Sequence, residues 1–310
     1  MADATSLILH HFKSSPFSEK IRLAFGLKGL SWVSVDIPNI MPKPDLTPLT
    51  GGYRRTPVLQ IGSDIYCDTQ LILREIERRH PAPSLYPNGE QGLAWMMSMW
   101  ADKTFFQASV PVIFGAEGFN VPEAFKQDRA QLSGRPFDSD QMRAAAPMMR
   151  DQWRGHAAWV EETLVGGKPF LFGGQPGLGD IAAHMNFWFL RNAYRPAYDA
   201  MMASFPKTSA WVERISAIGH GTSEIITSSE ALTIATSASS TPRIGIDPQE
   251  PQGLREGDYI AIAADDYGRD PVSGTLVFSD AFEIAIKRTV TGLGDVVVHF
   301  PRVGFTVRRS

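Results

Sequence analysis

Ser15 stands where a short apolar run, Ser6–Phe12, gives way to a helical pattern that begins at Pro16. Proline suits the first turn of a helix because the N–H group it lacks has no partner there. Ser15 is therefore expected at the N-cap, where free N–H groups and the positive helix end favour an anion. A thiolate is such an anion. A free thiol has a pKa of about 8.5, and lowering it by one unit requires about 1.4 kcal/mol, which a hydroxyl donor can supply. Serine is also a common ordinary cap, and Ser14 is the alternative donor if the register shifts by one.

Two further pairs of residues could contact the same ligand. Pro57 opens a strand, where it removes no ladder donor, and a cis Thr56–Pro57 bond would turn the Thr56 backbone toward a peptide-like ligand. Asp68 and Thr69 open the next helix. They are expected to cap it, and they could also hold a ligand's ammonium and carboxylate groups.

The elements that must position these residues form three regions. The first, 1–83, has the order strand, helix, strand, loop, strand, strand, helix. Its strands are expected near Ser6–Phe12, Ser31–Asp36, Pro57–Gly62 and Asp64–Cys67, and its helices over Pro16–Lys28 and from Asp68 to His80. The second, 84–237, reads as almost entirely helical, and a bundle is expected. The third, 238–310, follows a Ser/Thr/Pro-rich linker and contains about five short strands, which predict a small all-β, barrel-like domain.

The order and spacing of four motifs in the first region resemble the N-terminal domain of the cytosolic glutathione transferases, with the omega and zeta classes most similar. The motifs are Ser15–Arg22, Lys43–Asp45, Thr56–Leu59 and Asp68–Thr69. The resemblance extends over about Ser6–Ile218 and implies a thioredoxin-like α/β domain followed by an all-helical substrate domain.

The resemblance also implies a role for each matching residue. Ser15 matches the catalytic residue, and Phe17 matches the position beside the bound peptide. Lys43 matches a lysine that reaches the glycyl carboxylate, and Thr56 pairs its backbone with the cysteinyl moiety before cis-Pro57. Asp68 and Thr69 match the pair that holds the γ-glutamyl group. The implied activity is attack of the glutathione thiolate on a small apolar electrophile by conjugation, addition or isomerisation, and a homodimer is expected.

Three features depart from the family pattern. Omega enzymes have cysteine at the position of Ser15, and a serine cannot form a mixed disulfide, so thiol exchange through the enzyme is disfavoured. Gly177 stands three residues before Asp180, where relatives have a capping hydroxyl. The third region has no counterpart in the common plan. The electrophile pocket is expected near Trp100, Lys103 and Phe106.

Composition limits the other function classes. The net charge of −3 gives no field that would attract nucleic acid or an anionic membrane, and no apolar run is long enough for a membrane span. The single cysteine, Cys67, excludes an intramolecular disulfide and fits a cytoplasmic protein. No metal-binding motif is present, so no metal is expected. A non-catalytic glutathione-binding or protein-interaction module remains the alternative function.

Overall fold

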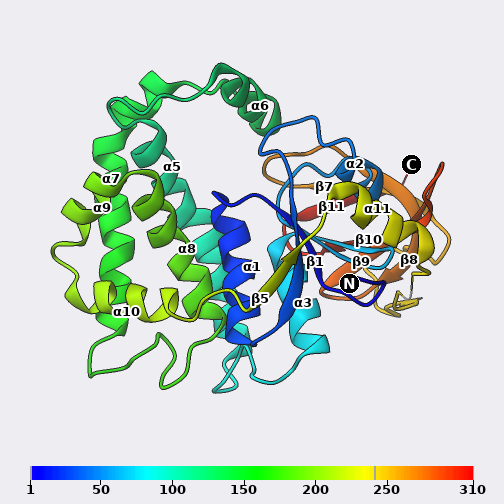
Figure 1. Cartoon of the computed structure of the whole chain (residues 1–310), viewed down its shortest axis with the longest axis horizontal. Coiled ribbons are helices and arrows are strands. Elements are labelled where there is room, and N and C mark those ends of the chain that lie inside the picture. The colour runs from blue at the N-terminus through cyan, green and yellow to red at the C-terminus, as the bar shows by residue number, and fades with distance from the viewer. Residues whose placement is uncertain (1, 241, 310) are drawn as a thin grey trace.

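The computed structural model describes residues 2–240 and 242–309. In the first region it confirms the predicted order of strands and helices, with short shifts at their ends, and adds one short helix, Leu46–Thr50, within the segment expected to be a loop (Figure 1). These elements are β1 (Ile8–His11), α1 (Pro16–Leu27), β2 (Ser31–Asp36), α2 (Leu46–Thr50), β3 (Val58–Ile61), β4 (Asp64–Cys67) and α3 (Thr69–Arg79). Strand β1 is parallel to β2 and antiparallel to β3, and β3 and β4 form an antiparallel hairpin.

The second region is helical, as predicted, and lies beside α1 (Figure 1). Its helices are α4 (Gln91–Trp100), the π-helical turn η1 (Ala101–Phe105), α5 (Phe106–Phe114), α6 (Glu123–Ser133), α7 (Ser139–Thr163), α8 (Leu178–Ala193), α9 (Arg195–Met202) and α10 (Pro206–Ser216). No helix in the described part of the chain is long and apolar enough to cross a bilayer.

Helix α8 begins without a capping hydroxyl, as expected from Gly177. The Asp180 carboxylate replaces it by accepting hydrogen bonds from the Gly177 N–H at 3.0 Å and the Leu171 N–H at 2.8 Å. The same carboxylate accepts a third bond, at 2.8 Å, from Trp211 Nε1 on α10. One buried carboxylate thus caps the start of α8 and ties it to the preceding loop at Leu171 and to α10 at Trp211.

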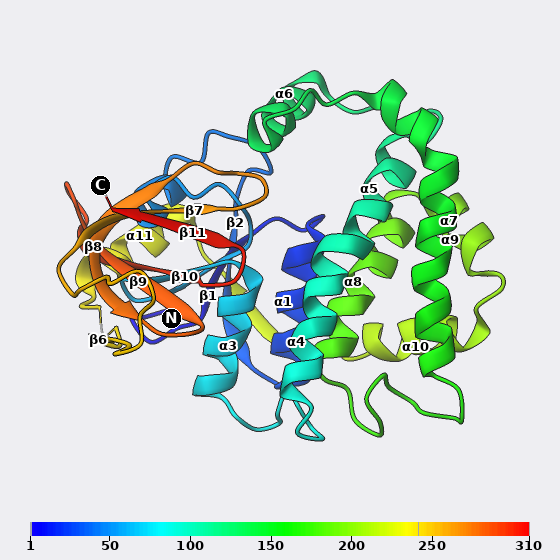
Figure 2. The same ribbon diagram turned by 180° about the vertical axis from the view of Figure 1, so that it is seen from behind.

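The C-terminal part of the chain is β-rich, as predicted, but its strands do not make a sheet of their own. Its elements are β5 (Thr222–Ile225), α11 (Ser228–Ser237), β6 (Gly245–Ile246), β7 (Tyr259–Ala264), β8 (Val272–Ser279), β9 (Glu283–Val290), β10 (Gly294–Pro301) and β11 (Phe305–Arg309). The first two, β5 and α11, lie within the 84–237 region that was expected to be a helical bundle. Strand β10 pairs in parallel with β4, and β5 pairs in parallel with β2 at the opposite edge. The result is one sheet with the open order β11-β7-β8-β9-β10-β4-β3-β1-β2-β5 rather than a separate barrel (Figure 2).

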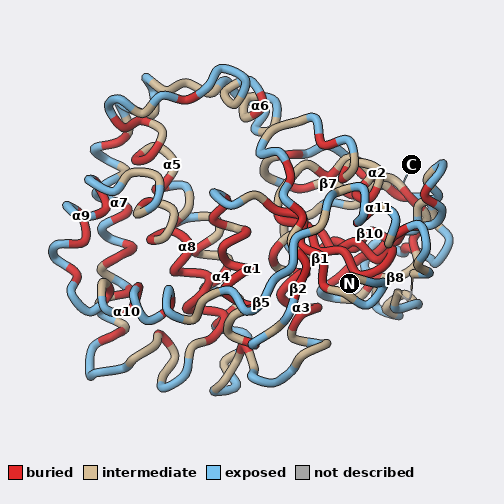
Figure 3. Tube along the Cα trace, in the orientation of Figure 1, coloured by how far each residue is buried: buried red, intermediate tan, exposed pale blue. Residues whose placement is uncertain are grey.

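Residues that alternate along the central strands divide between two apolar cores. Leu9 and Leu59 face α1, α3 and the helical bundle, whereas Ile8, Val58 and Ile65 face the opposite side. Helix α11 covers that opposite side with Ala231 and Ala235, and the C-terminal strands complete it with residues such as Ile286 and Val298. The tube coloured by burial shows the buried strands at the centre of this sheet (Figure 3).

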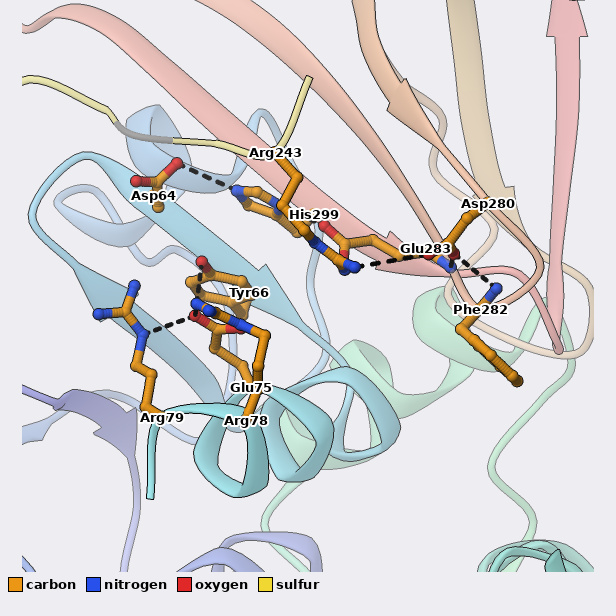
Figure 4. Close-up of polar contacts among 10 residues, drawn as sticks. All are labelled: Asp64, Tyr66, Glu75, Arg78, Arg79, Arg243, Asp280, Phe282, Glu283 and His299. Carbon is orange, nitrogen blue, oxygen red and sulfur yellow. Dashed lines mark hydrogen bonds and ion pairs between the residues drawn. The ribbon is translucent and has the colours of Figure 1, made fainter. Parts of the chain in front are cut away.

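A buried ionic cluster joins β10 to β4. His299 is 2% exposed, and its ring lies between the carboxylates of Glu283 and Asp64, with Nδ1 2.7 Å from Glu283 Oε1 and Nε2 3.1 Å from Asp64 Oδ1. Figure 4 shows this arrangement, with Arg243 reaching Glu283. The Tyr66 ring stacks on the imidazole at a centroid distance of 4.3 Å. Burial alone would lower the pKa of His299. The hydrogen bonds and charges of the two carboxylates outweigh burial, so the net effect is a pKa raised above the usual value.

Candidate functional site

A pocket opens where the start of α1, the segment before β3, the start of α3 and the junction of α4 with η1 meet. It encloses about 490 Å³ of space free of atoms, part of which is open to solvent. The N-terminal unit contributes eight of its lining residues: Phe17, Tyr53, Arg55, Thr56, Pro57, Asp68, Thr69 and Gln70. The helical region adds Met99, Asp102 and Lys103, and the C-terminal region adds Asp266 and Tyr267. All three regions therefore contribute to one pocket.

Six of the ten residues predicted for the site line this pocket: Phe17, Thr56, Pro57, Asp68, Thr69 and Lys103. The Thr56–Pro57 peptide bond is cis. This bond lies directly before β3, so that Thr56 stands at the pocket end of the central sheet.

Asp68 begins α3 in an unusual conformation. Its φ is 71°, in the left-handed region that a residue other than glycine rarely adopts. The carboxylate accepts a hydrogen bond from the Gln70 N–H at 3.0 Å, so the predicted cap is present. Thr69 follows as the first helical residue and is 4% exposed. The pocket thus has a helix N-terminus, which favours an anion, directly beside a carboxylate, which favours a cation.

Ser15 occupies the predicted N-cap of α1 but does not itself line the pocket. Its hydroxyl oxygen accepts a hydrogen bond from the Ser18 N–H at 3.1 Å, and the residue is 3% exposed. Among the described residues, the structure shows no acceptor for the Ser15 hydroxyl hydrogen. Phe17, two residues further on, reaches the pocket wall. Ser14, the alternative donor, is exposed in the preceding turn.

Lys43 lies behind the pocket rather than in its wall. Its ammonium donates to Thr56 Oγ1 at 2.9 Å and to the Arg54 carbonyl at 3.3 Å. Burial, together with the charges of Arg129 and Arg54, lowers the pKa of Lys43 to about 8, although Asp128 opposes this effect. In this arrangement Lys43 fixes the segment that presents Thr56 and has no free ammonium facing the pocket.

The residues predicted for an electrophile pocket are divided. Lys103 lines the pocket, and Phe106 packs edge-on against Phe17 with the ring centroids 4.9 Å apart. Trp100 instead packs within the helical region, stacked on Phe105, and its Nε1 donates to His156 Nδ1 at 3.2 Å. Trp100 therefore does not join the pocket wall.

Sequence reasoning missed several charged residues at the pocket. The π-helical turn η1 places Asp102 over α1, where both of its carboxylate oxygens accept from Lys20 Nζ at 2.7 and 2.6 Å. Such turns often occur at functional sites because they re-aim the side chains that follow. Burial raises the pKa of Asp102, and Lys20 opposes this effect. Arg55 also lines the pocket, and its side chain is 12% exposed and ion-paired with Asp266.

The described residues contain no group of three or more His, Cys, Asp or Glu side chains that could hold a metal ion. Cys67 is buried, and burial raises the pKa of its thiol well above the usual value. The polar groups that line the pocket are hydroxyl, amide, carboxylate, ammonium and guanidinium groups.

Comparisons with known proteins agree with this arrangement. Residues 9–84 match the family "Glutathione S-transferase, N-terminal domain", and residues 122–214 match "Glutathione S-transferase, C-terminal domain". A GST-like protein from Pseudomonas syringae is 37% identical, with a TM-score of 0.82, over 99% of this chain and 100% of that one. This similarity includes the C-terminal strands.

More distant relatives match a smaller part of the chain. FtsZ-localized protein A from Caulobacter vibrioides is 25% identical over 180 residues, which are 56% of this chain and 73% of that protein. A glutathione S-transferase from Methylobacterium radiotolerans, solved in complex with glutathione sulfonate, shares the fold. It has a TM-score of 0.50 and 23% identity, over 72% of this chain and 98% of that one. Because both family domains match in order and the 37% identity extends over the whole chain, the protein belongs to the cytosolic glutathione transferase family, whose members use glutathione.

Proposed function

We propose that this protein is a glutathione transferase that binds glutathione in the pocket described above. The observation that carries the proposal is the convergence of Thr56, Asp68 and Thr69 on one pocket together with Phe17. The Thr56 backbone, before cis-Pro57, pairs with the cysteinyl part of the peptide. Asp68 takes the γ-glutamyl ammonium, and the α3 N-terminus at Thr69 takes the adjacent carboxylate.

In the proposed mechanism, Ser15 stabilises the thiolate of bound glutathione. The thiol gives up its proton to solvent, and the hydroxyl donates its free hydrogen to the sulfur anion. The Ser18 N–H, already bonded to the Ser15 oxygen, polarises this hydroxyl. The thiolate then attacks a small apolar electrophile, forming a carbon–sulfur bond. In a conjugation by substitution a leaving group departs with its electron pair, and in an addition the electrons of the attacked double bond move to its far end, which takes a proton from solvent. Phe17, Phe106 and Met99 supply apolar surface on that side of the pocket, and holding the two reactants together lowers the entropic cost of their reaction.

The test is Ser15→Ala, with Ser14→Ala as the matched control in the same turn. Loss of one donor to a reacting anion is expected to reduce kcat by about 100-fold. Glutathione affinity should stay within about twofold, since its peptide contacts remain. Absorbance titration of the bound thiol should show its pKa rising by about one unit or more in Ser15→Ala, on the order of the value of a single charge-assisted hydrogen bond. An unchanged rate and thiol pKa would remove Ser15 from the mechanism.

A second candidate is a non-catalytic interaction module. It is favoured by the position of Asp266 and Tyr267 in the pocket wall, and by the relative whose name places it with FtsZ. Glutathione binding without turnover on any of a panel of electrophiles, together with cosedimentation with FtsZ polymers, would support this candidate. Turnover that depends on Ser15 would exclude it.

The proposal includes a cytoplasmic homodimer. Helix α4 exposes two large apolar side chains, Leu93 and Met96, with 58% and 69% of their surface accessible in the single chain. Light scattering of the purified protein measures its mass directly, and a monomer at micromolar concentration would argue against the dimer.

A further inference from the structure

The turn that joins β7 to β8, residues 265–271, enters the proposed glutathione pocket. It has no regular secondary structure, and Asp266 and Tyr267 at its tip line the pocket. The Gly268 N–H donates to the Leu132 carbonyl on α6 at 2.6 Å, which holds the far side of the turn against the helical region. A segment of the C-terminal region thus bridges the two domains over the site.

Asp266 is shared by two cations of the pocket wall. One carboxylate oxygen accepts from Arg55, and the other accepts from Lys103 Nζ at 2.7 Å. The Arg55 guanidinium also bonds to the Tyr267 carbonyl and lies 3.9 Å from the centroid of the Tyr267 ring. The exposed fractions of the three charged side chains are 12% for Arg55, 28% for Asp266 and 36% for Lys103. Burial acts against ionisation of Asp266, but Lys103 and Arg55 outweigh it and lower its pKa.

The charges around the pocket leave these two cations as the partners for a second ligand carboxylate. Arg55 and Lys103 are the lysine and arginine residues among its lining residues. Lys43 is engaged with Thr56 and the Arg54 carbonyl, and Lys20 is engaged with Asp102. Glutathione has two carboxylates, and the α3 N-terminus can accept only one of them. The other one needs a cation, and both available cations are bound to a carboxylate of the chain itself.

Given glutathione as the proposed ligand, we propose that Asp266 is an intramolecular stand-in for the glycyl carboxylate of glutathione. In this view Arg55 and Lys103 form the subsite for that carboxylate, and the peptide must displace Asp266 to bind. Tyr267 keeps its contact with Arg55, so the guanidinium stays oriented after Asp266 leaves. Only molecules in which Asp266 has left the subsite can then bind glutathione, so the apparent Kd equals the intrinsic Kd divided by the fraction of such molecules.

The test compares Asp266→Asn with Asp265→Asn by calorimetry. Asp265 provides a matched control because it is next in the chain, carries the same charge, is 48% exposed and lies 3.5 Å from Lys103 Nζ. Asp266→Asn is expected to bind glutathione about tenfold more tightly than the unaltered protein, as for a competing state that occupies about 90% of the molecules. Asp265→Asn should change the affinity less than about twofold, since the charge of an exposed group is largely screened. The gain in Asp266→Asn should disappear for glutathione esterified at its glycyl carboxylate.

Hydrogen exchange on the unaltered protein provides a second measurement that does not depend on a variant. Glutathione should speed exchange of the Tyr267 amide, because its acceptor, Asp266 Oδ1 at 2.8 Å, moves away when the carboxylate is displaced. Four outcomes would overturn the stand-in role while leaving glutathione binding intact. Asp266→Asn could bind glutathione more weakly than the unaltered protein, or Asp265→Asn could gain as much affinity as Asp266→Asn. The gain could also be as large for the ester, or the turn could become more protected from exchange when glutathione binds. If neither the unaltered protein nor Asp266→Asn binds glutathione, the proposed function fails as well.

Discussion

Replacing His299 with leucine should weaken the attachment of the C-terminal strands to the rest of the sheet. The imidazole is 2% exposed and bonds to Glu283 and Asp64, which are also buried. Leucine fills a similar volume but donates no hydrogen bond. Both carboxylates would then stay in the core without the imidazolium between them.

The size of the effect follows from the burial of the group. Removing one partner of a buried, hydrogen-bonded ion pair costs about 3–5 kcal/mol. Here both carboxylates would lose the cation that lies between them, although Arg243 still pairs with Glu283. At about 2–4 °C per kcal/mol for a cooperative unit of this size, the melting temperature should fall by about 6–20 °C. The control is His10→Leu. His10 is also a buried histidine of this sheet, but its Nε2 bonds to the neutral Gln60 side chain at 2.8 Å, and burial lowers its pKa to about 4.

The pH dependence separates an ionic role from simple packing. The pKa of His299 is raised in the folded protein, so its contribution to stability is complete below the unfolded value of about 6.5. The contribution is lost as the pH rises through the folded value. The difference in unfolding free energy between the unaltered protein and His299→Leu should therefore shrink above neutral pH, whereas the His10→Leu difference should not. A His299→Leu cost below about 1 kcal/mol, or a cost independent of pH, would refute the ionic argument.

Two further predictions concern close packing and helix capping. In Gly26→Ala, the new Cβ would lie 2.0 Å from the Gly219 carbonyl oxygen, so α1 must shift from the loop after α10, and a loss of about 1–3 kcal/mol in chemical denaturation is expected. The control is Gly155→Ala in α7, which also has no positive φ and whose Cβ meets no atom within 4 Å, so it should show no such loss. Asp180→Ala removes the acceptor for three buried donors and should lower the free energy of unfolding by about 3 kcal/mol or more. Asp180→Asn keeps one carbonyl acceptor and should lower it less. Equal losses of stability in the two variants, measured by thermal unfolding, would argue against the capping role.

Local patterns predicted most individual helices and strands because the signals for each, its apolar period and its turn or cap residues, lie within a few adjacent positions. The alternation in Ser31–Asp36 matches β2 at both ends, and the turn at Ser63 separates β3 from β4 as expected. Strand β5, Thr222–Ile225, was missed because all of its residues are exposed and it has no apolar period. It is a strand only because β2, nearly 200 residues earlier, supplies its partner.

The same distinction applies to the pocket. Thr56, Asp68 and Thr69 could be identified because each lies at the start of an element, where sequence signals are strong. Asp102 and Asp266 could not, since their roles arise from contacts with Lys20 and Arg55, which are 82 and 211 residues away in the sequence. Burial and pairing over such separations depend on the sheet order and on the π-helical turn, which no local pattern encodes.

The C-terminal strands and the N-terminal sheet depend on each other for their cores. Val298 and Ile286 complete the apolar side to which Ile65 and Leu49 belong, so removing the C-terminal region would expose that side and the β4 edge together. A truncated chain would therefore lose the fold of the sheet together with the 265–271 turn. Its loss of activity would then not show what the turn itself does. Point substitutions in that turn, which leave β10 paired with β4, separate the structural role of the C-terminal region from its role at the pocket.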